Sequence, residues 1–536
     1  MLVLIIFLAT IFIGYLLLTP YYLGESKPEL VNDFNIIPRH EWTLNTDILQ
    51  YSSIIIVDKE ELIVEALLFL NNLKEDVIYK NKNSTKCLIL NEQKQLKASV
   101  VFKILKIPLM NVPGMSPVGL WKIKCKFKIS KKEDSYKDFN VAIINSDHFK
   151  NDEYSDIFHN SSAIFPSNLI KYQNPTIYYS NKRKKPAIAN CVHLVRNLKA
   201  DRLERLLKWL EIQFSIGMKH ITFYFFEPNE LAKRLIEEKY SSDKVVIVDY
   251  QTSKSQVCKS ELEMIKLHSP NSKQYKHLYE VCENSFEKHF NMSKGYTMNT
   301  HERLNTNDCY MHYRNEYEFV TNMDFDELFF PRQHETRSVS NINDTKNYCL
   351  SKPNHPDIYE YAKRMFVKHG FRSASLSFEH VLFINVSVEF FNSLFETQND
   401  RFKAEIKNNR SLFFDVFPKD KPYLNYLLDA KNAFACLNSK YRKSESVWNN
   451  AYATLMNNRD GKSIYKSEYT EAINQHFATS ILPSTKKTSI PLADGFSSHF
   501  REYTGNFFFN QHISINNFFV DIEYYKYFIS FQNDIN

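Results

Sequence analysis

The sequence is poor in glycine, with 10 in 536 residues. Neither G-x-x-x-x-G-K-[ST] nor G-x-G-x-x-G occurs anywhere in it, which excludes the usual glycine-rich phosphate loops of nucleotide-binding enzymes. No C-x-x-C pair occurs either, which argues against a structural zinc site. Any nucleotide that this protein binds must therefore be held by residues other than a glycine-rich loop.

Massed positive charge is also missing. The net charge of +7 is modest for this length, and the basic residues are scattered along the chain. A nucleic-acid-binding protein typically shows a basic stripe within a recognisable module, and the sequence has neither. The chain is long enough to bury a large core and to form more than one domain.

The amino terminus carries the one long apolar run. Residues 1–18 are nearly all apolar, and no Lys or Arg precedes Lys27. This length reaches the lower end of a membrane span, and two tyrosines follow at the position of an interfacial belt. We expect an uncleaved signal anchor at residues 1–20 and a polar stem at residues 21–45. A cleaved signal peptide is the alternative.

The rest of the chain is then expected outside the cytoplasm. Eight cysteines form an even set, which predicts disulfides in an oxidising compartment. Glycosylation sequons point the same way, and they lie at Asn83, Asn160, Asn291, Asn343, Asn385 and Asn409.

Residues 46–180 read as a β-rich accessory module. Strand-like segments dominate it, with one helical stretch expected around Glu60–Leu73, and Cys87 and Cys125 are candidates for a disulfide within it. Residues 122–128 alternate between lysine and apolar side chains, as in a half-buried strand. We expect the lysine face of that strand to be solvated.

From residue 186 to 515 the pattern changes to alternating strands and helices. Strands are predicted at 187–195, 220–226 and 244–250, with helices at 200–214 and 229–240. This alternation predicts an α/β fold with a parallel sheet wound by helices, in which ligands bind at the carboxyl ends of the strands. The candidate binding residues at those ends are His193, Arg196, Tyr224 and Asp249.

Two aspartates follow the next predicted strand. The β-prone run 317–323 leads into Asp324-Phe325-Asp326, and strict alternation would put both carboxylates on one face. Such a pair suits a hard divalent cation whose remaining ligands are water or phosphate oxygens. The alternative is a solvated acidic turn. Upstream, Arg303 and Arg314 are candidates for diphosphate contacts or, equally, for surface ion pairs.

Several of these motifs resemble glycosyltransferase family 92. The similar segments include Gly217-x-x-His220-x-x-x-Tyr224, Asn307-Asp308-Cys309, Asp324-Phe325-Asp326-Glu327, Lys462-Ser463-Ile464 before a helix-like stretch with His476, and His499-Phe500-Arg501. The resemblance implies a GT-A (Rossmann-like) fold in a type II Golgi membrane protein with a lumenal catalytic domain. It also implies inverting transfer of galactose from UDP-galactose to a glycan acceptor, an N-glycan or another glycoconjugate, with a divalent cation such as Mn²⁺.

Carried over by this resemblance, Asp324 and Asp326 hold the metal and the diphosphate, and His476 or His499 adds a metal or phosphate contact. Asp308 and Arg501 are the further candidates for nucleotide binding. An inverting reaction also needs a carboxylate base, for which the candidates are Glu327, Glu379 and Asp415. Residues 516–536 read as a C-terminal tail. A glycoside hydrolase and an inactive carbohydrate-binding protein are the competing functions.

Overall fold

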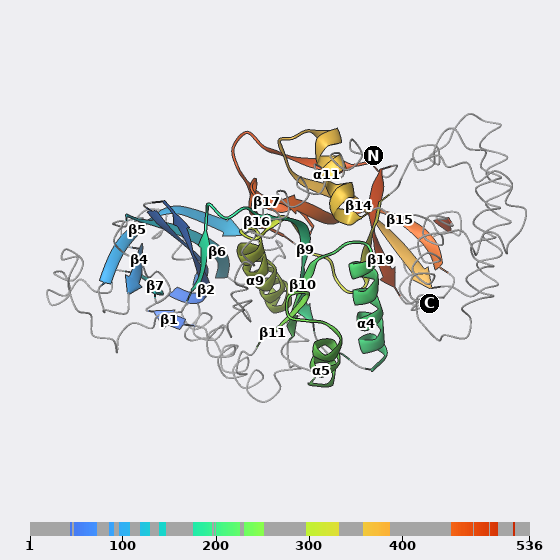
Figure 1. The fold of residues 1–536 in the computed structure, drawn as a ribbon, viewed down its shortest axis with the longest axis horizontal. Helices are drawn as coiled ribbons and strands as arrows, with labels where there is room; N and C mark the ends of the chain where they lie inside the picture. Colours follow the sequence, from blue (N-terminus) through green and yellow to red (C-terminus); the bar gives the residue numbers. More distant parts are fainter. Residues whose placement is uncertain are drawn as a thin grey trace, which may run out of the picture.

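The computed structural model describes residues 43–45, 48–59, 61–71, 85–90, 96–107, 118–128, 139–145, 175–195, 198, 200–225, 230–250, 296–331, 357–385, 452–474, 476–491, 494–501 and 518–519. These residues form two large β-sheets, with helices packed on the second one (Figure 1). The sheets mix parallel and antiparallel strands, so the α/β class expected from the sequence is confirmed.

The first sheet contains eight strands in the order β1-β2-β3-β6-β5-β4-β7, with β8 parallel to β2. The disulfide Cys87–Cys125 joins β4 to β6, as the sequence suggested. The strands are β1 (Thr43–Asn45), β2 (Ile48–Asp58), β3 (Glu61–Asn71), β4 (Thr85–Leu90), β5 (Leu96–Ile107), β6 (Val118–Lys128), β7 (Asn140–Asn145) and β8 (Thr176–Tyr179).

The helix expected around Glu60–Leu73 is wrong, because this segment is strand β3. It forms a tight hairpin with β2, in which Asp58 pairs with Glu61 and Lys59 adopts a φ of 52°. Side chains from both faces of β3 are buried. A strand covered on both faces reads as a continuous apolar run, and periodicity alone does not distinguish such a run from a helix.

The second sheet contains ten strands, and one half of it is parallel in the order β11-β10-β9-β12. Among the described residues, helices α4, α5 and α9 lie between these strands in the chain. The first two confirm the helices predicted at 200–214 and 229–240, whereas α9 was not predicted from the sequence. The elements are β9 (Lys185–Val195), α4 (Ala200–Ser215), β10 (His220–Phe225), α5 (Glu230–Lys239), β11 (Val245–Asp249), α9 (Tyr296–Tyr313) and β12 (Tyr317–Thr321). Because the strand order reverses between β9 and β12, their carboxyl ends form the switch point at which such sheets bind ligands.

The other half of the second sheet continues from β12 as β15-β14-β19-β13, with β18 and β20 at its sides. The helix expected around His476 is wrong, because that residue lies between the two strands of a hairpin, β16 and β17. The elements are β13 (Glu327–Pro331), α11 (Ile358–His369), β14 (Ser373–Asn385), β15 (Tyr452–Lys466), β16 (Thr470–Ile473), β17 (Ala478–Ile481), β18 (Lys486–Ile490), β19 (Gly495–Arg501) and β20 (Phe518–Phe519).

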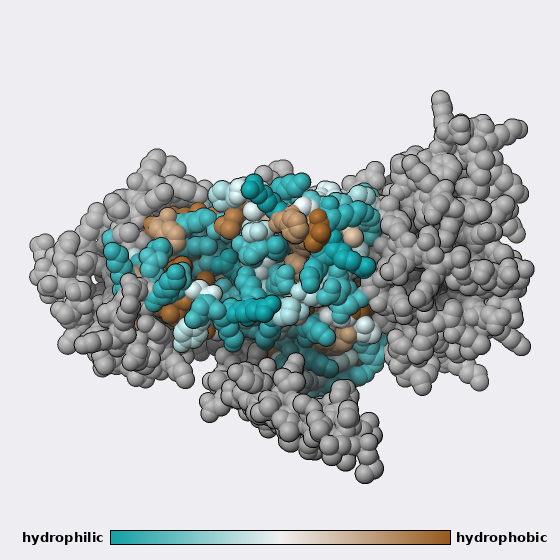
Figure 2. All heavy atoms as spheres, turned by 45° about the horizontal axis from the view of Figure 1, so that its top comes forward, coloured by the Kyte–Doolittle hydropathy of each residue, from teal (hydrophilic) through white to brown (hydrophobic). Residues whose placement is uncertain are grey.

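Helix α9 lies between the two sheets (Figure 1). Its neighbour in the first sheet is Tyr51, whose hydroxyl donates to Asn305 Oδ1 at 3.0 Å. We call the boundary between the first sheet and α9 with the second sheet the seam. A single cluster of buried apolar residues crosses it and includes Tyr51, Leu67, Leu120, Tyr224, Leu304 and Tyr310. On the outer face that Figure 2 shows, the described residues are mostly hydrophilic, with small separate apolar patches. The seam buries apolar side chains from both sheets.

Charged residues also cross this seam, and they correct the expectation for the lysine face of β6. Lys122 is 1% exposed, and its ammonium lies 2.6 Å from Glu65 Oε2. Lys124 pairs with both Glu65 and Glu471, and Arg314 at the end of α9 also pairs with Glu65. Only Lys126 and Lys128 on this face are exposed. The alternation predicted for β6 is confirmed, but Glu471 of β16 and Arg314 after α9 cover half of its basic face.

Among the described residues, no helix is both long and apolar enough to cross a membrane. The segment on which the anchor prediction depends, residues 1–20, lies outside them, as do residues 21–42 of the predicted stem and four of the eight cysteines. The last three residues of the predicted stem, 43–45, form β1 and pair with β2. The anchor, the stem and the predicted domain boundaries therefore stay predictions.

Candidate functional site

The switch point of the second sheet brings together two residues that the sequence predicted for the site. His193 lies near the end of β9, and Asp324 follows the end of β12. His193 Nε2 is 2.6 Å from Asp324 Oδ1. Burial lowers the pKa of His193, but the nearby carboxylates of Asp324 and Glu302 outweigh it and raise this pKa to about 9. The imidazole is therefore protonated at neutral pH and forms an ion pair with Asp324.

Asp324 and Asp326 lie on a turn rather than on the strand itself. Strand β12 ends at Thr321, so the alternation expected to align the two carboxylates stops before them. The turn closes when the Glu327 amide donates to the Asp324 carbonyl at 3.0 Å. The Asp324 amide in turn donates to Glu327 Oε2 at 3.0 Å. Both aspartates are partly exposed, and Glu327 is 2% exposed.

Buried polar side chains hold this turn from three sides. The side-chain amide of Asn190 on β9 pairs with both backbone groups of Met323, at 2.7 and 3.2 Å. Asn322 donates to the Asn474 carbonyl at 2.9 Å. Trp209 of α4 donates its indole N–H to the Glu327 carbonyl at 2.7 Å. Backbone groups held this way keep the acidic turn in a fixed place.

Lys462 is the charged partner of the turn. Its ammonium lies 3.2 Å from Asp324 Oδ2 and 3.1 Å from Glu327 Oε2, and its side chain is 2% exposed. Burial alone lowers the pKa of Lys462, but these two carboxylates raise it above its ordinary value. Asp324 is thus bonded to a cationic group on each of its carboxylate oxygens.

His476 also belongs to this neighbourhood. Burial and the positive charge of Lys462 lower the pKa of His476 to about 4, against the opposing effect of Asp324. The ring is therefore neutral at physiological pH, which is the form that binds a metal or accepts a hydrogen bond.

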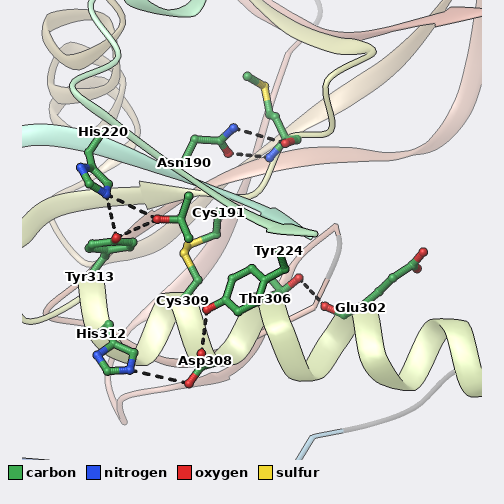
Figure 3. Close-up of a disulfide and its surroundings, with 12 residues drawn as sticks. Asn190, Cys191, His220, Tyr224, Glu302, Thr306, Asp308, Cys309, His312 and Tyr313 are labelled. Carbon is green, nitrogen blue, oxygen red and sulfur yellow. Dashed lines mark hydrogen bonds and ion pairs between the residues drawn. A yellow bond between two sulfur atoms is a disulfide. The ribbon is translucent and has the colours of Figure 1, made fainter. Parts of the chain in front are cut away.

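The Asn307-Asp308-Cys309 motif lies on α9, and its three side chains bind three different elements. Figure 3 shows the contacts of Asp308 and Cys309. Asn307 pairs with both backbone groups of Ile473 in β16. Asp308 accepts from the Tyr224 hydroxyl of β10 at 2.7 Å. Cys309 forms a disulfide with Cys191 of β9. In this structure Tyr224 and Asp308 are fully buried and contact each other; their contact with a nucleotide stays a prediction.

The remaining predicted residues are not assembled with the turn by the contacts described. Asp249 forms an ion pair with Lys233 at 2.9 Å. Arg303 is 1% exposed, and its burial lowers the guanidinium pKa to about 10. Glu379 is exposed on β14.

Four predicted residues are described in part or not at all. Strand β19 pairs the backbone of His499 with that of Glu327, but the side chains of His499 and Arg501 lie outside the described residues, as do Arg196 and Asp415 altogether. Their roles stay predictions.

The chemistry of the donor set fits a divalent cation that shares its ligands with a substrate. Asp324 and Asp326 offer the oxygen atoms that hard cations prefer. Within the part of the chain that the structure describes, no group of three or more His, Cys, Asp and Glu side chains could hold a metal ion. A cation held by these aspartates would therefore take further ligands from phosphate oxygens and water.

Two supports of the turn were missed as site residues on the sequence. Asn190 is an isolated amide in an apolar strand, and only the pairing of β9 with β12 places it beside Met323. Lys462 belongs to a motif that resembles the family, but the sequence alone assigns it no role. The available signal was a lysine at the start of a β-prone run. Both act over more than 130 positions of sequence, which local patterns do not reveal.

Comparison with known proteins agrees with the motifs. No curated protein matched the chain. The family model described as Glycosyltransferase family 92 matches residues 187–527, which is more than half of the chain and contains the acidic turn, Lys462 and the Asn-Asp-Cys motif. The protein therefore belongs to glycosyltransferase family 92.

Proposed function

We propose that residues 186–515 form a GT-A catalytic domain that transfers galactose from UDP-galactose to a hydroxyl group of a glycan. The observation that carries this proposal is the acidic turn with Asp324 and Asp326. It lies at the switch point of the parallel half-sheet, within the segment that matches the glycosyltransferase family. The donor, the metal and the inverting outcome are parts of the proposal.

Asp324 and Asp326 would hold a divalent cation such as Mn²⁺ against the diphosphate of the donor. When bound, such a cation neutralises charge on the diphosphate leaving group. The chain contributes the fixed geometry of the turn, because Asn190, Trp209 and Glu327 hold its backbone. Preorganised groups of this kind stabilise charge in a transition state without having to move.

In the inverting reaction, the oxygen of the acceptor hydroxyl forms a bond with the anomeric carbon of the sugar. The bond from that carbon to the phosphate oxygen breaks, its electron pair leaves with UDP, and the hydroxyl proton passes to a carboxylate base. Of the described candidates we favour Glu379. Its backbone carbonyl is linked to the Lys462 amide through Ser497 Oγ, so the residue lies close to the turn although its side chain is exposed and does not contact the turn. Desolvation raises the pKa of its carboxyl group, whereas Glu327 is buried and bonded to Lys462.

The test is Asp326→Asn, which keeps the size of the side chain and removes its charge. We expect the variant to lose most of the Mn²⁺-dependent binding of UDP. Release of UDP from UDP-galactose should fall about 100- to 1000-fold, which corresponds to about 3–4 kcal/mol of transition-state stabilisation. Asp58→Asn in the β2–β3 hairpin is the matched control and should behave as the parent.

Thermal unfolding of both variants shows whether the fold is intact. Full activity of folded Asp326→Asn, with its Mn²⁺ dependence unchanged, would remove the acidic turn from the proposal. Binding of UDP by the parent that does not respond to Mn²⁺ would instead favour a hydrolase or an inactive carbohydrate-binding protein.

A further inference from the structure

We propose that Lys462 is the resident cation of the donor site. It is a positioning residue that holds the acidic turn and supplies a permanent positive charge beside the diphosphate. This inference rests on the proposed function, because it assumes that the turn receives a nucleotide sugar. Its basis is the pair of contacts to Asp324 and Glu327, at 3.2 and 3.1 Å, made by a lysine that is almost completely buried.

A buried ammonium group is costly to desolvate unless carboxylates surround it. Lys462 meets this condition because two carboxylates of the same turn flank its ammonium. Glu327 bridges Lys462 to the Asp324 amide. The lysine therefore holds the turn both through Glu327 and through its own contact with the Asp324 carboxylate. The three groups form a closed arrangement in which moving the ammonium would displace the turn.

The backbone around Lys462 is built irregularly, and this aims its side chain. The pairing of β14 with β15 shifts register next to Glu379, opposite the segment that contains Gly461. A Cβ atom on Gly461 would lie 2.1 Å from Ser497 Oγ and 2.6 Å from the Phe378 carbonyl, so only glycine fits. Ser497 Oγ in turn accepts from the Lys462 amide at 3.0 Å. Register irregularities of this kind redirect side chains next to active sites.

If Lys462 acts through its charge, removing that charge should affect the binding of Mn²⁺ and the binding of UDP differently. A lysine that only supports the fold would affect both alike. A positive charge beside Asp324 repels a bare divalent cation but attracts a diphosphate. Neutralising Lys462 should therefore weaken the binding of UDP while leaving the binding of Mn²⁺ alone unchanged or tighter. Loss of fold or of general packing would weaken both.

The experiment compares Lys462→Met, Lys462→Arg, Glu327→Gln and the double variant Lys462→Met/Glu327→Gln in the full chain. The double variant guards against misfolding, because it removes both charges of the buried pair together. Its comparison with Glu327→Gln isolates the charge of Lys462, because these two variants differ only at that residue. Lys466→Met is the matched control. It lies on the same strand, where its ammonium pairs at 2.7 Å with the exposed Glu468.

Each variant is measured for thermal unfolding, for Mn²⁺ binding, for UDP binding in Mn²⁺ and for UDP release from UDP-galactose. We expect the double variant to fold, to bind UDP at least about 10-fold more weakly than Glu327→Gln and to release UDP about 100-fold more slowly than Glu327→Gln. Its Mn²⁺ affinity should be no lower than that of Glu327→Gln. Lys462→Arg should recover part of the UDP binding, and Lys466→Met should match the parent.

UDP affinity and turnover in the folded double variant that match those of Glu327→Gln would overturn the inference while the proposed function stands. Equal losses of Mn²⁺ and UDP binding relative to Glu327→Gln would also overturn it, because the lost charge of Lys462 acts on the two ligands in opposite directions. A parent protein that binds no UDP in Mn²⁺ would refute the proposed function itself, and the inference with it.

Discussion

The two described disulfides should differ in what their removal does to activity. Cys191 precedes His193 by two residues on β9, and its partner Cys309 follows Asp308 on α9. Removing this disulfide releases the strand end that carries His193 from the helix beneath it. The disulfide between Cys87 and Cys125 connects strands of the first sheet only. We expect its loss to reduce stability and to leave turnover unchanged.

The expected losses of stability are similar because loop entropy depends on the logarithm of loop length. The disulfides join cysteines separated by 118 and 38 positions. In the chain-entropy model these loops correspond to about 5 and about 4 kcal/mol at 25 °C. All four cysteines are fully buried, so substitution by alanine adds a small packing cost in both cases. Stability alone therefore hardly distinguishes the two pairs.

The assay combines urea unfolding with UDP release from UDP-galactose for the two double alanine variants, at a temperature where both remain folded. We expect each variant to lose about 2–5 kcal/mol of unfolding free energy. Only the variant lacking the β9–α9 disulfide should show slower turnover. Equal turnover in the two variants would refute the view that this disulfide positions the site.

Two further substitutions test the buried charge at the seam and the choice of base. Glu65→Gln should lower the unfolding free energy by about 3–5 kcal/mol, because it leaves buried cations uncompensated. Glu61→Gln, at the exposed pair with Lys126, should lower it by less than about 1 kcal/mol. Equal urea midpoints for the two variants would contradict this expectation. Glu379→Gln should abolish turnover and retain UDP binding. Since partial burial raises the Glu379 pKa, parental activity should decline on acidification above the pH at which an ordinary carboxyl titrates, and an active variant would exclude this base.

Much of the parallel half-sheet was predictable because its information is local. Helix α4 shows its buried leucines at helical spacing, and Gly217 ends it with a φ of 97°. The Asp-x-Asp pair was equally visible. The supports of that pair were not, since Asn190 and Lys462 reach it only through strand pairing between distant segments. Local patterns encode an element, whereas its neighbours depend on how the sheet is assembled.

The errors in the first sheet have the same origin. The β3 segment was read as a helix because burial on both faces removed its alternation. Lys122 and Lys124 were read as solvated because their strand alternates correctly, and alternation shows only that the two faces differ. The basic face is covered because Arg314 and Glu471 pack against it. Both residues lie far away in the sequence, so the pattern of β6 does not reveal them.

The shared core has a consequence for where this protein can be divided. The family match begins at residue 187, but the apolar cluster that includes Leu304 and Tyr310 is completed by Tyr51, Leu67 and Leu120. A fragment that starts at residue 187 would expose that apolar surface to water. It would also leave Arg314 without its ion-pair partner Glu65. The segment that matches the family model is thus shorter than the smallest fragment that we expect to remain soluble by itself.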